Sequence, residues 1–155
     1  GELGTIQTLQ AMRSLVLESL RSEKLCNIAT QIFASTGYQG SRRILLDRVD
    51  SYLRSCFQYV PEEIETVQTP EYMIIGKEIN GFYFGDCDDI STLEAAILTC
   101  LGIPVRFVCI RSKPNTSSYD HVYIESLIDG EWIVSDITVT KGTQHQWFQR
   151  LEIAI

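Results

Sequence analysis

Cys87 stands in a sequence context that suits a nucleophile. It lies within Gly85-Asp86-Cys87-Asp88-Asp89, directly before an apolar pattern with helical spacing. Asp86 can cap that helix with Asp89 at the N3 position, and Gly85 permits a tight turn before it. Cys87 then falls in the first helical turn, where the helix dipole favours a thiolate. Because the neighbouring aspartates oppose the thiolate, the dipole alone is too weak and a histidine partner is needed.

A predicted hairpin identifies the histidine partner. The chain has 2 histidines, His121 and His145, and His145 is assigned to packing beside two aromatic residues. The Asp-Gly pair at 129–130 is a strong signal for a two-residue type I′ turn, which places Asp136 opposite Tyr123. His121 is then a diagonal neighbour of Asp136 on one face of the sheet, within hydrogen-bonding reach. We therefore predict that Asp136 orients His121 and that His121 serves the cysteine as its base.

A Cys87, His121 and Asp136 triad is suited to acyl transfer from amide bonds. His121 takes the thiol proton, the thiolate attacks a carbonyl, and a thioester forms as the amine leaves. Water or another amine then resolves the thioester. The oxyanion is expected to meet the Cys87 backbone N–H and a side-chain donor from the preceding loop. The candidates for that donor are Gln68, Tyr72, Asn80 and Tyr83.

Helices and an antiparallel sheet must position the triad. Apolar spacing predicts one long helix or two abutting ones over 6–33, and a further helix from a Ser41 cap to about Tyr59. The connection over 61–84 is predicted to be loop with a short helix near 72–77. The remaining expected elements are the nucleophile helix over 88–101 and strands over 105–110, 121–128 and 132–137.

Charge and hydropathy exclude several kinds of partner. The 13 basic and 20 acidic residues give a net charge of −7, which repels nucleic acid and anionic lipid. There is no apolar run long enough for a membrane span and no visible signal peptide, so a cytoplasmic or virion-associated protein is expected. A group of arginines on one predicted helix is assigned to its solvated face. These are Arg42, Arg43, Arg48 and Arg54.

The 5 cysteines include no C-x-x-C pair, which argues against a disulfide framework or a closed zinc site and fits a reducing compartment. Four of them lie in apolar segments, where a free cysteine behaves as a small buried hydrophobe. These four are Cys26, Cys56, Cys100 and Cys109. No cofactor is expected. The aspartates around Cys87 lack the further ligands of a calcium site, and zinc held by Cys87, His121 and Asp136 is disfavoured.

Four segments together resemble the transglutaminase-like core domain: GDCDD at 85–89, GIPVR at 102–106, HVYIE at 121–125 and GEWIVSDIT at 130–138. The resemblance covers about 67–140 and is strongest to small phage and prophage proteins with a G-D-C-D-D motif. The family's Cys, His and Asp fall on Cys87, His121 and Asp136, while Ile137 replaces the usual proline after the aspartate.

The length of 155 residues predicts one domain over 1–155, and the resemblance implies that this domain is α+β with a papain-like fold. In that fold, a helical scaffold over 1–60 and the nucleophile helix pack on a small antiparallel sheet. The function it implies is amide-bond hydrolysis or acyl transfer through a thioester, in a peptidase or amidase acting on a peptide or protein. The alternative is a non-catalytic phage structural or assembly module that keeps the fold and binds phage structural proteins, since a fold does not fix an activity.

Overall fold

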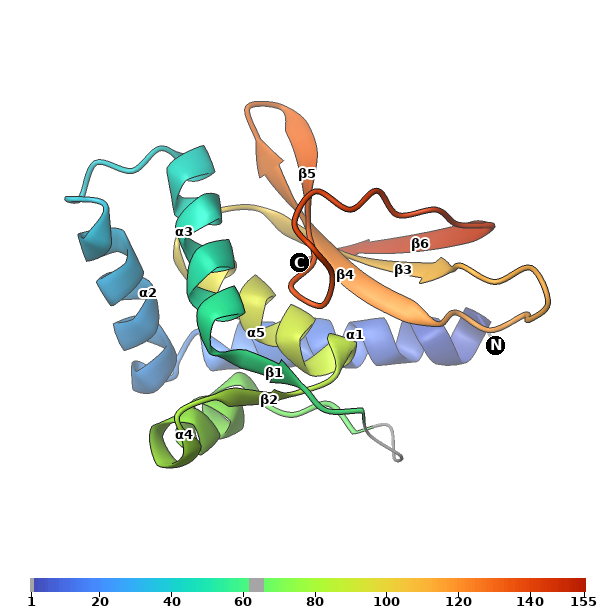
Figure 1. Cartoon of the computed structure of the whole chain (residues 1–155), viewed down its shortest axis with the longest axis horizontal. Coiled ribbons are helices and arrows are strands. Elements are labelled where there is room, and N and C mark those ends of the chain that lie inside the picture. The colour runs from blue at the N-terminus through green and yellow to red at the C-terminus, as the bar shows by residue number, and fades with distance from the viewer. Residues whose placement is uncertain (1, 62–65) are drawn as a thin grey trace.

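The computed structural model describes residues 2–61 and 66–155. The structure is α+β, with a group of helices at one end, the larger sheet at the other and the helix that begins at Cys87 between them (Figure 1). The elements are α1 Glu2–Ser19, α2 Glu23–Ser35, α3 Arg42–Cys56, β1 Phe57–Tyr59, α4 Pro70–Asn80, β2 Tyr83–Gly85, α5 Cys87–Cys100, β3 Val105–Arg111, β4 His121–Ile128, β5 Glu131–Ser135 and β6 Gln149–Ala154. None of the described helices is both long and apolar enough to cross a membrane.

Helix α5 lies at the centre of the fold. It contacts α1, α2, α3 and α4 as well as strands β2, β3 and β4. Every residue from 89 to 98 is buried, and apart from the two acids Asp89 and Glu94 their side chains are apolar or small. Ala95 and Ala96 are fully buried beside large residues such as Leu93 and Ile97. Because α5 is held on all sides, its first residue, Cys87, has a fixed position.

The larger sheet is antiparallel and has the strand order β5-β4-β3-β6. Both residues of the turn at 129–130 have positive φ, 52° and 80°, as a type I′ turn requires. β4 pairs with β5 so that Ile124 lies opposite Ser135. The next pair in this register is Tyr123 and Asp136, so the predicted hairpin register is confirmed.

Two pairings lie outside the sequence prediction. β6 adds a fourth strand beside β3, and β1 pairs with β2 in parallel. The second pairing ends α3 at Cys56 instead of about Tyr59, because 57–59 is extended against 83–85. A strand of 3 residues has no periodicity that a sequence pattern could reveal.

Helix boundaries follow the capping residues. The segment 6–33 forms two helices, since Ser22 caps α2 with its hydroxyl accepting the N–H of Leu25. α4 is longer than the predicted 72–77 because Thr69 caps its start and Gly81 ends it in the left-handed conformation, with φ 87°. Part of the predicted connection over 61–84, at 62–65, lies outside the described residues.

Candidate active site

Two aspartates, Asp86 and Asp89, cap the N-terminus of α5. The Asp86 carboxylate accepts the backbone N–H groups of Asp88 at 3.1 Å and Asp89 at 3.3 Å. The Asp89 carboxylate in turn accepts the Asp86 N–H at 3.0 Å. The predicted capping box is therefore confirmed, and it places Cys87 at the first position of the helix.

Asp89 also explains why the preceding residue is glycine. A Cβ atom on Gly85 would lie 2.7 Å from Asp89 Oδ2, too close for any other residue. Gly85 is not among the glycines with positive φ, so the tight-turn explanation from the sequence is wrong and close approach is the reason. Asp89 is fully buried and accepts the Gln68 N–H at 2.7 Å, which ties the preceding loop to the helix.

The predicted histidine and aspartate meet directly. His121 Nε2 lies 2.6 Å from Asp136 Oδ2, across the diagonal of the hairpin. Asp136 Oδ1 accepts the Thr138 N–H at 3.0 Å and its hydroxyl at 2.7 Å. Burial would raise the pKa of Asp136, but the hydrogen bond and charge of His121, with the bonds from Thr138 and His145, lower that pKa to about 2.

An ionised Asp136 fixes the tautomer of the His121 ring. A carboxylate is an acceptor only, so Nε2 must carry the proton and donate it. In the neutral ring Nδ1 is then the nitrogen with a free lone pair, and it is the atom that can take a proton from a thiol. The His121 side chain is 22% exposed while that of Asp136 is 2% exposed, so the imidazole lies on the solvent side of the pair.

A second histidine, which the sequence assigned to packing, binds the same carboxylate. His145 Nε2 lies 2.8 Å from Asp136 Oδ2, and its ring stacks on Tyr123 with centroids 4.1 Å apart. The ring does pack, as predicted, but it also donates to the site. His145 comes from the irregular segment between β5 and β6, where no periodicity or hairpin rule places a side chain.

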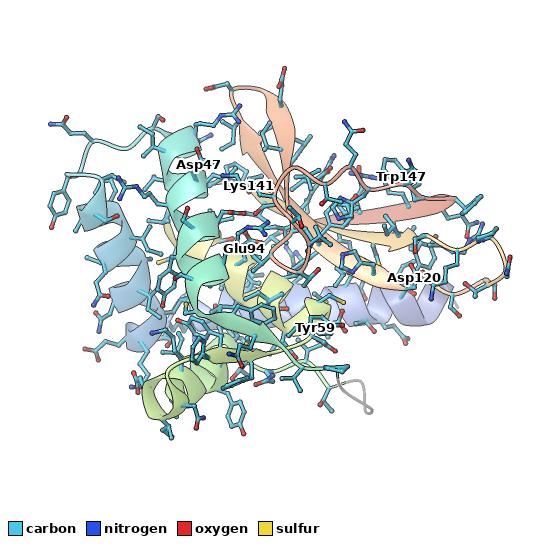
Figure 2. All side chains as sticks on the ribbon, viewed as in Figure 1. Asp47, Tyr59, Glu94, Asp120, Lys141 and Trp147 are labelled. Atoms are coloured by element: carbon cyan, nitrogen blue, oxygen red, sulfur yellow. The ribbon has the colours of Figure 1, made fainter. Side chains whose placement is uncertain are left out.

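Cys87 and His121 line one cavity of about 520 Å³. Tyr59, at the end of β1, and Asp120, next to the start of β4, line it as well (Figure 2). A larger cavity of about 600 Å³ lies on the other side of Asp136 and is not lined by Cys87. The smaller cavity is therefore the one that gives a substrate access to the sulfur.

The Cys87 thiol is in its protonated form in this setting. Burial raises its pKa to about 12, with the charges of Asp88, Asp86 and Asp136 adding to the effect and the Val122 backbone N–H opposing it. The thiol is directed at Asp88 Oδ1, 3.8 Å from the sulfur. A thiolate at this position therefore needs a cation beside it, as the sequence analysis inferred.

The four residues considered as oxyanion donors are placed elsewhere. Gln68 Nε2 donates to the Phe84 carbonyl at 3.0 Å, and the Asn80 amide donates to Gly76 at 3.0 Å. The Tyr83 hydroxyl is 2.6 Å from that of Tyr52. Tyr72, with 66% of its surface exposed, lines a separate pocket on α4. None of the four lines the cavity of Cys87.

Tyr59 lines the cavity of Cys87 and is a candidate donor that the sequence analysis did not consider. The parallel pairing of β1 with β2 sets Tyr59 opposite Gly85, two residues before Cys87. Burial raises the pKa of Tyr59, and the aspartates at the start of α5 raise it further, so its hydroxyl keeps its proton. Only the β1–β2 pairing, which the sequence pattern does not show, brings this tyrosine to the site.

Arg54 is not on a solvated face, so that assignment is wrong for it. Its guanidinium pairs with Asp50 at 2.8 Å and donates to the carbonyls of Asp136 at 2.7 Å and Val139 at 2.5 Å. The Asp50 side chain is only 9% exposed. Arg54 thus ties α3 to the segment that follows β5, from Asp136 to Val139.

A buried acid lies beneath the same strand. Figure 2 shows Glu94 between α3 and the sheet. Its carboxyl group accepts the Ser135 hydroxyl at 2.5 Å, and the residue is 1% exposed. Burial raises the pKa of Glu94 well above its usual value. Burial thus disfavours the ionised form of this carboxyl group, which lies directly beneath the residue that precedes Asp136.

Metal-ligating atoms of His121, Asp136 and His145 lie within 4.8 Å of one another. Ligands around a tetrahedral zinc ion are separated by about 3.3 Å, given metal-to-ligand distances of about 2.0 Å. The two nitrogen-to-oxygen distances here are 2.6 and 2.8 Å, which are lengths of direct hydrogen bonds. Hydrogen bonding therefore accounts for this cluster.

The comparison with known families agrees with this geometry. Residues 28–137, more than half of the chain, match the model of the transglutaminase-like superfamily. The chain belongs to the transglutaminase-like superfamily. No curated protein matches it in sequence.

Two solved structures share the fold. One is a proposed protease from Parabacteroides distasonis, with a TM-score of 0.64 and 13% identity, over 84% of this chain and 26% of that one. The other is a proposed cysteine protease from Cytophaga hutchinsonii, with a TM-score of 0.55 and 18% identity, over 79% of this chain and 42% of that one. The chain thus spans less than half the length of either protein, and the likeness concerns the fold.

Proposed function

We propose that this superfamily member is a cysteine peptidase or amidase that cleaves amide bonds through a thioester on Cys87. The observation that carries the proposal is the 2.6 Å contact of His121 Nε2 with an ionised Asp136, on a ring that shares a cavity with Cys87. Because this contact occupies Nε2 of His121, Nδ1 of the same ring is the atom that acts as the base. The two solved structures with this fold are named as a proposed protease and a proposed cysteine protease, which supports peptidase chemistry over cross-linking.

In the first half of the reaction, the thiol proton leaves its contact with Asp88 and passes to His121 Nδ1. The sulfur attacks the substrate carbonyl carbon, and the resulting oxyanion is met by the Cys87 backbone N–H and the Tyr59 hydroxyl. The carbon-to-nitrogen bond then breaks, and His121 returns the proton to the leaving amine. The product of this half is the thioester and a free amine.

In the second half, His121 Nδ1 takes a proton from water, and the hydroxide attacks the thioester carbon. The carbon-to-sulfur bond breaks, the proton returns to the sulfur, and a carboxylic acid leaves. Asp136 remains ionised throughout and stabilises the imidazolium. The cavity is lined by Asp86, Asp88 and Asp120, and its described lining residues include no lysine or arginine. The site therefore favours a neutral or cationic peptide.

Acylation by p-nitrophenyl acetate tests the proposal without knowledge of the natural substrate. The expected result is a burst of one nitrophenolate per chain and a hydroxylamine-sensitive acetyl group on Cys87, found by peptide mass spectrometry. Cys87→Ser and His121→Ala should both lack the burst. A parent protein without a burst would instead favour the non-catalytic module, to which a thiol pKa of about 12 is suited.

A further inference from the structure

One carboxylate oxygen in the site serves two histidines. Asp136 Oδ2 lies 2.6 Å from His121 Nε2 and 2.8 Å from His145 Nε2. Its other oxygen, Oδ1, accepts both bonds from Thr138. All four lone-pair positions of the carboxylate are therefore occupied, two on each oxygen.

His145 must be a donor in this arrangement. Because Asp136 is ionised, Nε2 of His145 carries the proton, and Nδ1 of the same ring is unprotonated in the neutral form. That Nδ1 atom is buried and has no hydrogen-bond partner among the described residues. The side chain is 7% exposed, so the unpartnered Nδ1 atom is also shielded from water. The bond from Nε2 to the ionised Asp136 offsets the free-energy cost of burying that nitrogen.

The position of His145 is fixed from two further sides. Its ring stacks on Tyr123 at 4.1 Å and lies nearly parallel to the His121 ring, with an interplanar angle of 11° and centroids 5.8 Å apart. Arg54 holds the same segment by donating to the carbonyls of Asp136 and Val139. His145 therefore meets the carboxylate as a rigid donor on the side away from Thr138.

We propose that His145 is a positioning residue, whose N–H holds the Asp136 carboxylate in the orientation that fixes the His121 ring toward Cys87. This role rests on the proposed function, since it concerns the same reaction. Asp136 is the first residue after β5, where the strand pairing that fixes backbone position has ended. Arg54 holds the Asp136 carbonyl, but the orientation of the carboxylate depends on the hydrogen bonds to the side chain, and His145 supplies one of these four.

Two substitutions separate the hydrogen bond from the packing. His145→Phe keeps an aromatic ring on Tyr123 but removes the donor. His145→Gln loses the ring but can place an amide N–H near the position of Nε2. We expect the acylation rate of Cys87 to fall about 10-fold to 100-fold in His145→Phe, because this is the usual effect of losing a hydrogen bond to a charged group. In His145→Gln we expect the rate to be within about 3-fold of that of the parent.

Nuclear magnetic resonance gives a second readout that does not depend on activity. With only 2 histidines in the chain, the imidazole N–H resonances are readily assigned. The Nε2–H resonance of His121 should be protected from solvent exchange in the parent and in His145→Gln, and should be lost to exchange in His145→Phe. A merely structural role in packing predicts the opposite order, with His145→Gln the more damaged variant.

The outcomes distinguish this inference from the proposed function. Loss in His145→Phe with rescue in His145→Gln supports it. Parent-like acylation and a protected His121 resonance in His145→Phe, while His121→Ala is inactive, would overturn it and leave the proposed function standing. Where the parent itself shows no burst, the proposed function fails, and the exchange of the His121 resonance alone decides whether His145 positions that ring.

Discussion

Removal of the His121 imidazole should leave Cys87 with the reactivity of an ordinary buried thiol. Burial and the nearby aspartates set the pKa of that thiol at about 12, against about 8.5 for free cysteine. The difference of about 3.5 pKa units leaves about 3,000-fold less thiolate at neutral pH. A more basic thiolate is also more nucleophilic, with a Brønsted slope of about 0.4–0.5, which recovers about 30-fold of the loss. His121→Ala should therefore react about 100-fold more slowly than a free thiol.

The resting thiol of the parent has the same raised pKa, but in the parent His121 can take the thiol proton, so that the thiolate forms beside an imidazolium and reacts faster than in His121→Ala. The assay is the rate of iodoacetamide alkylation of each cysteine at pH 6 to 9, read by peptide mass spectrometry. Cys109 is an internal control, since it lines the same cavity, has no histidine partner in the proposed mechanism, and has a pKa that burial raises to about 12. Cys87 should be the faster of the two in the parent and close to Cys109 in His121→Ala.

His121→Gln is the matched variant for this experiment. Its amide can keep a hydrogen bond to Asp136 but cannot accept a proton as a base, so it should label as slowly as His121→Ala. Thermal unfolding of both variants controls for loss of structure. Equal alkylation of Cys87 in the parent and both variants below pH 7 would refute the assignment of His121 as the activating group.

Three further predictions concern residues around the triad. Tyr59→Phe should slow acylation by p-nitrophenyl acetate about 100-fold yet leave iodoacetamide alkylation unchanged, because alkylation forms no oxyanion; equal slowing of both would contradict the donor role. Arg54→Met should lower the free energy of unfolding by about 3 kcal/mol, since it leaves Asp50 buried and unpaired, and a second change of Asp50→Asn should recover part of the loss in urea titrations. The pKa of Glu94 is higher in the folded protein than in the unfolded chain. Its protonated form therefore stabilises the fold fully below the unfolded-state pKa, and this stabilisation declines as the pH rises toward the folded-state pKa. In the parent, the free energy of unfolding should fall by about 1.4 kcal/mol per pH unit in this range. Glu94→Gln should remove this fall when the free energy of unfolding is measured from about pH 4.5 upward.

The sequence by itself determined the parts of this protein that depend on short-range rules. An Asp-Gly turn has one favoured geometry, so the partner of Tyr123 and the diagonal from His121 to Asp136 followed from counting residues. Capping chemistry likewise placed Cys87 at the first position of α5. In each case the relevant atoms are separated by one helical turn or one tight hairpin, and local stereochemistry leaves few alternatives.

Only the tertiary structure decided which distant residues complete the site. His145 contacts Asp136 from an irregular segment, and Arg54 contacts the same segment from α3. Tyr59 lines the cavity of Cys87 because β1 pairs in parallel with β2. The entropy of loop closure changes little with loop length, so it does not favour one path for an irregular connection over another. The path is therefore set by the residues against which the connection packs. Stacking on Tyr123 and bonding to Asp136 make that selection for His145, and neither leaves a periodic signal in the sequence.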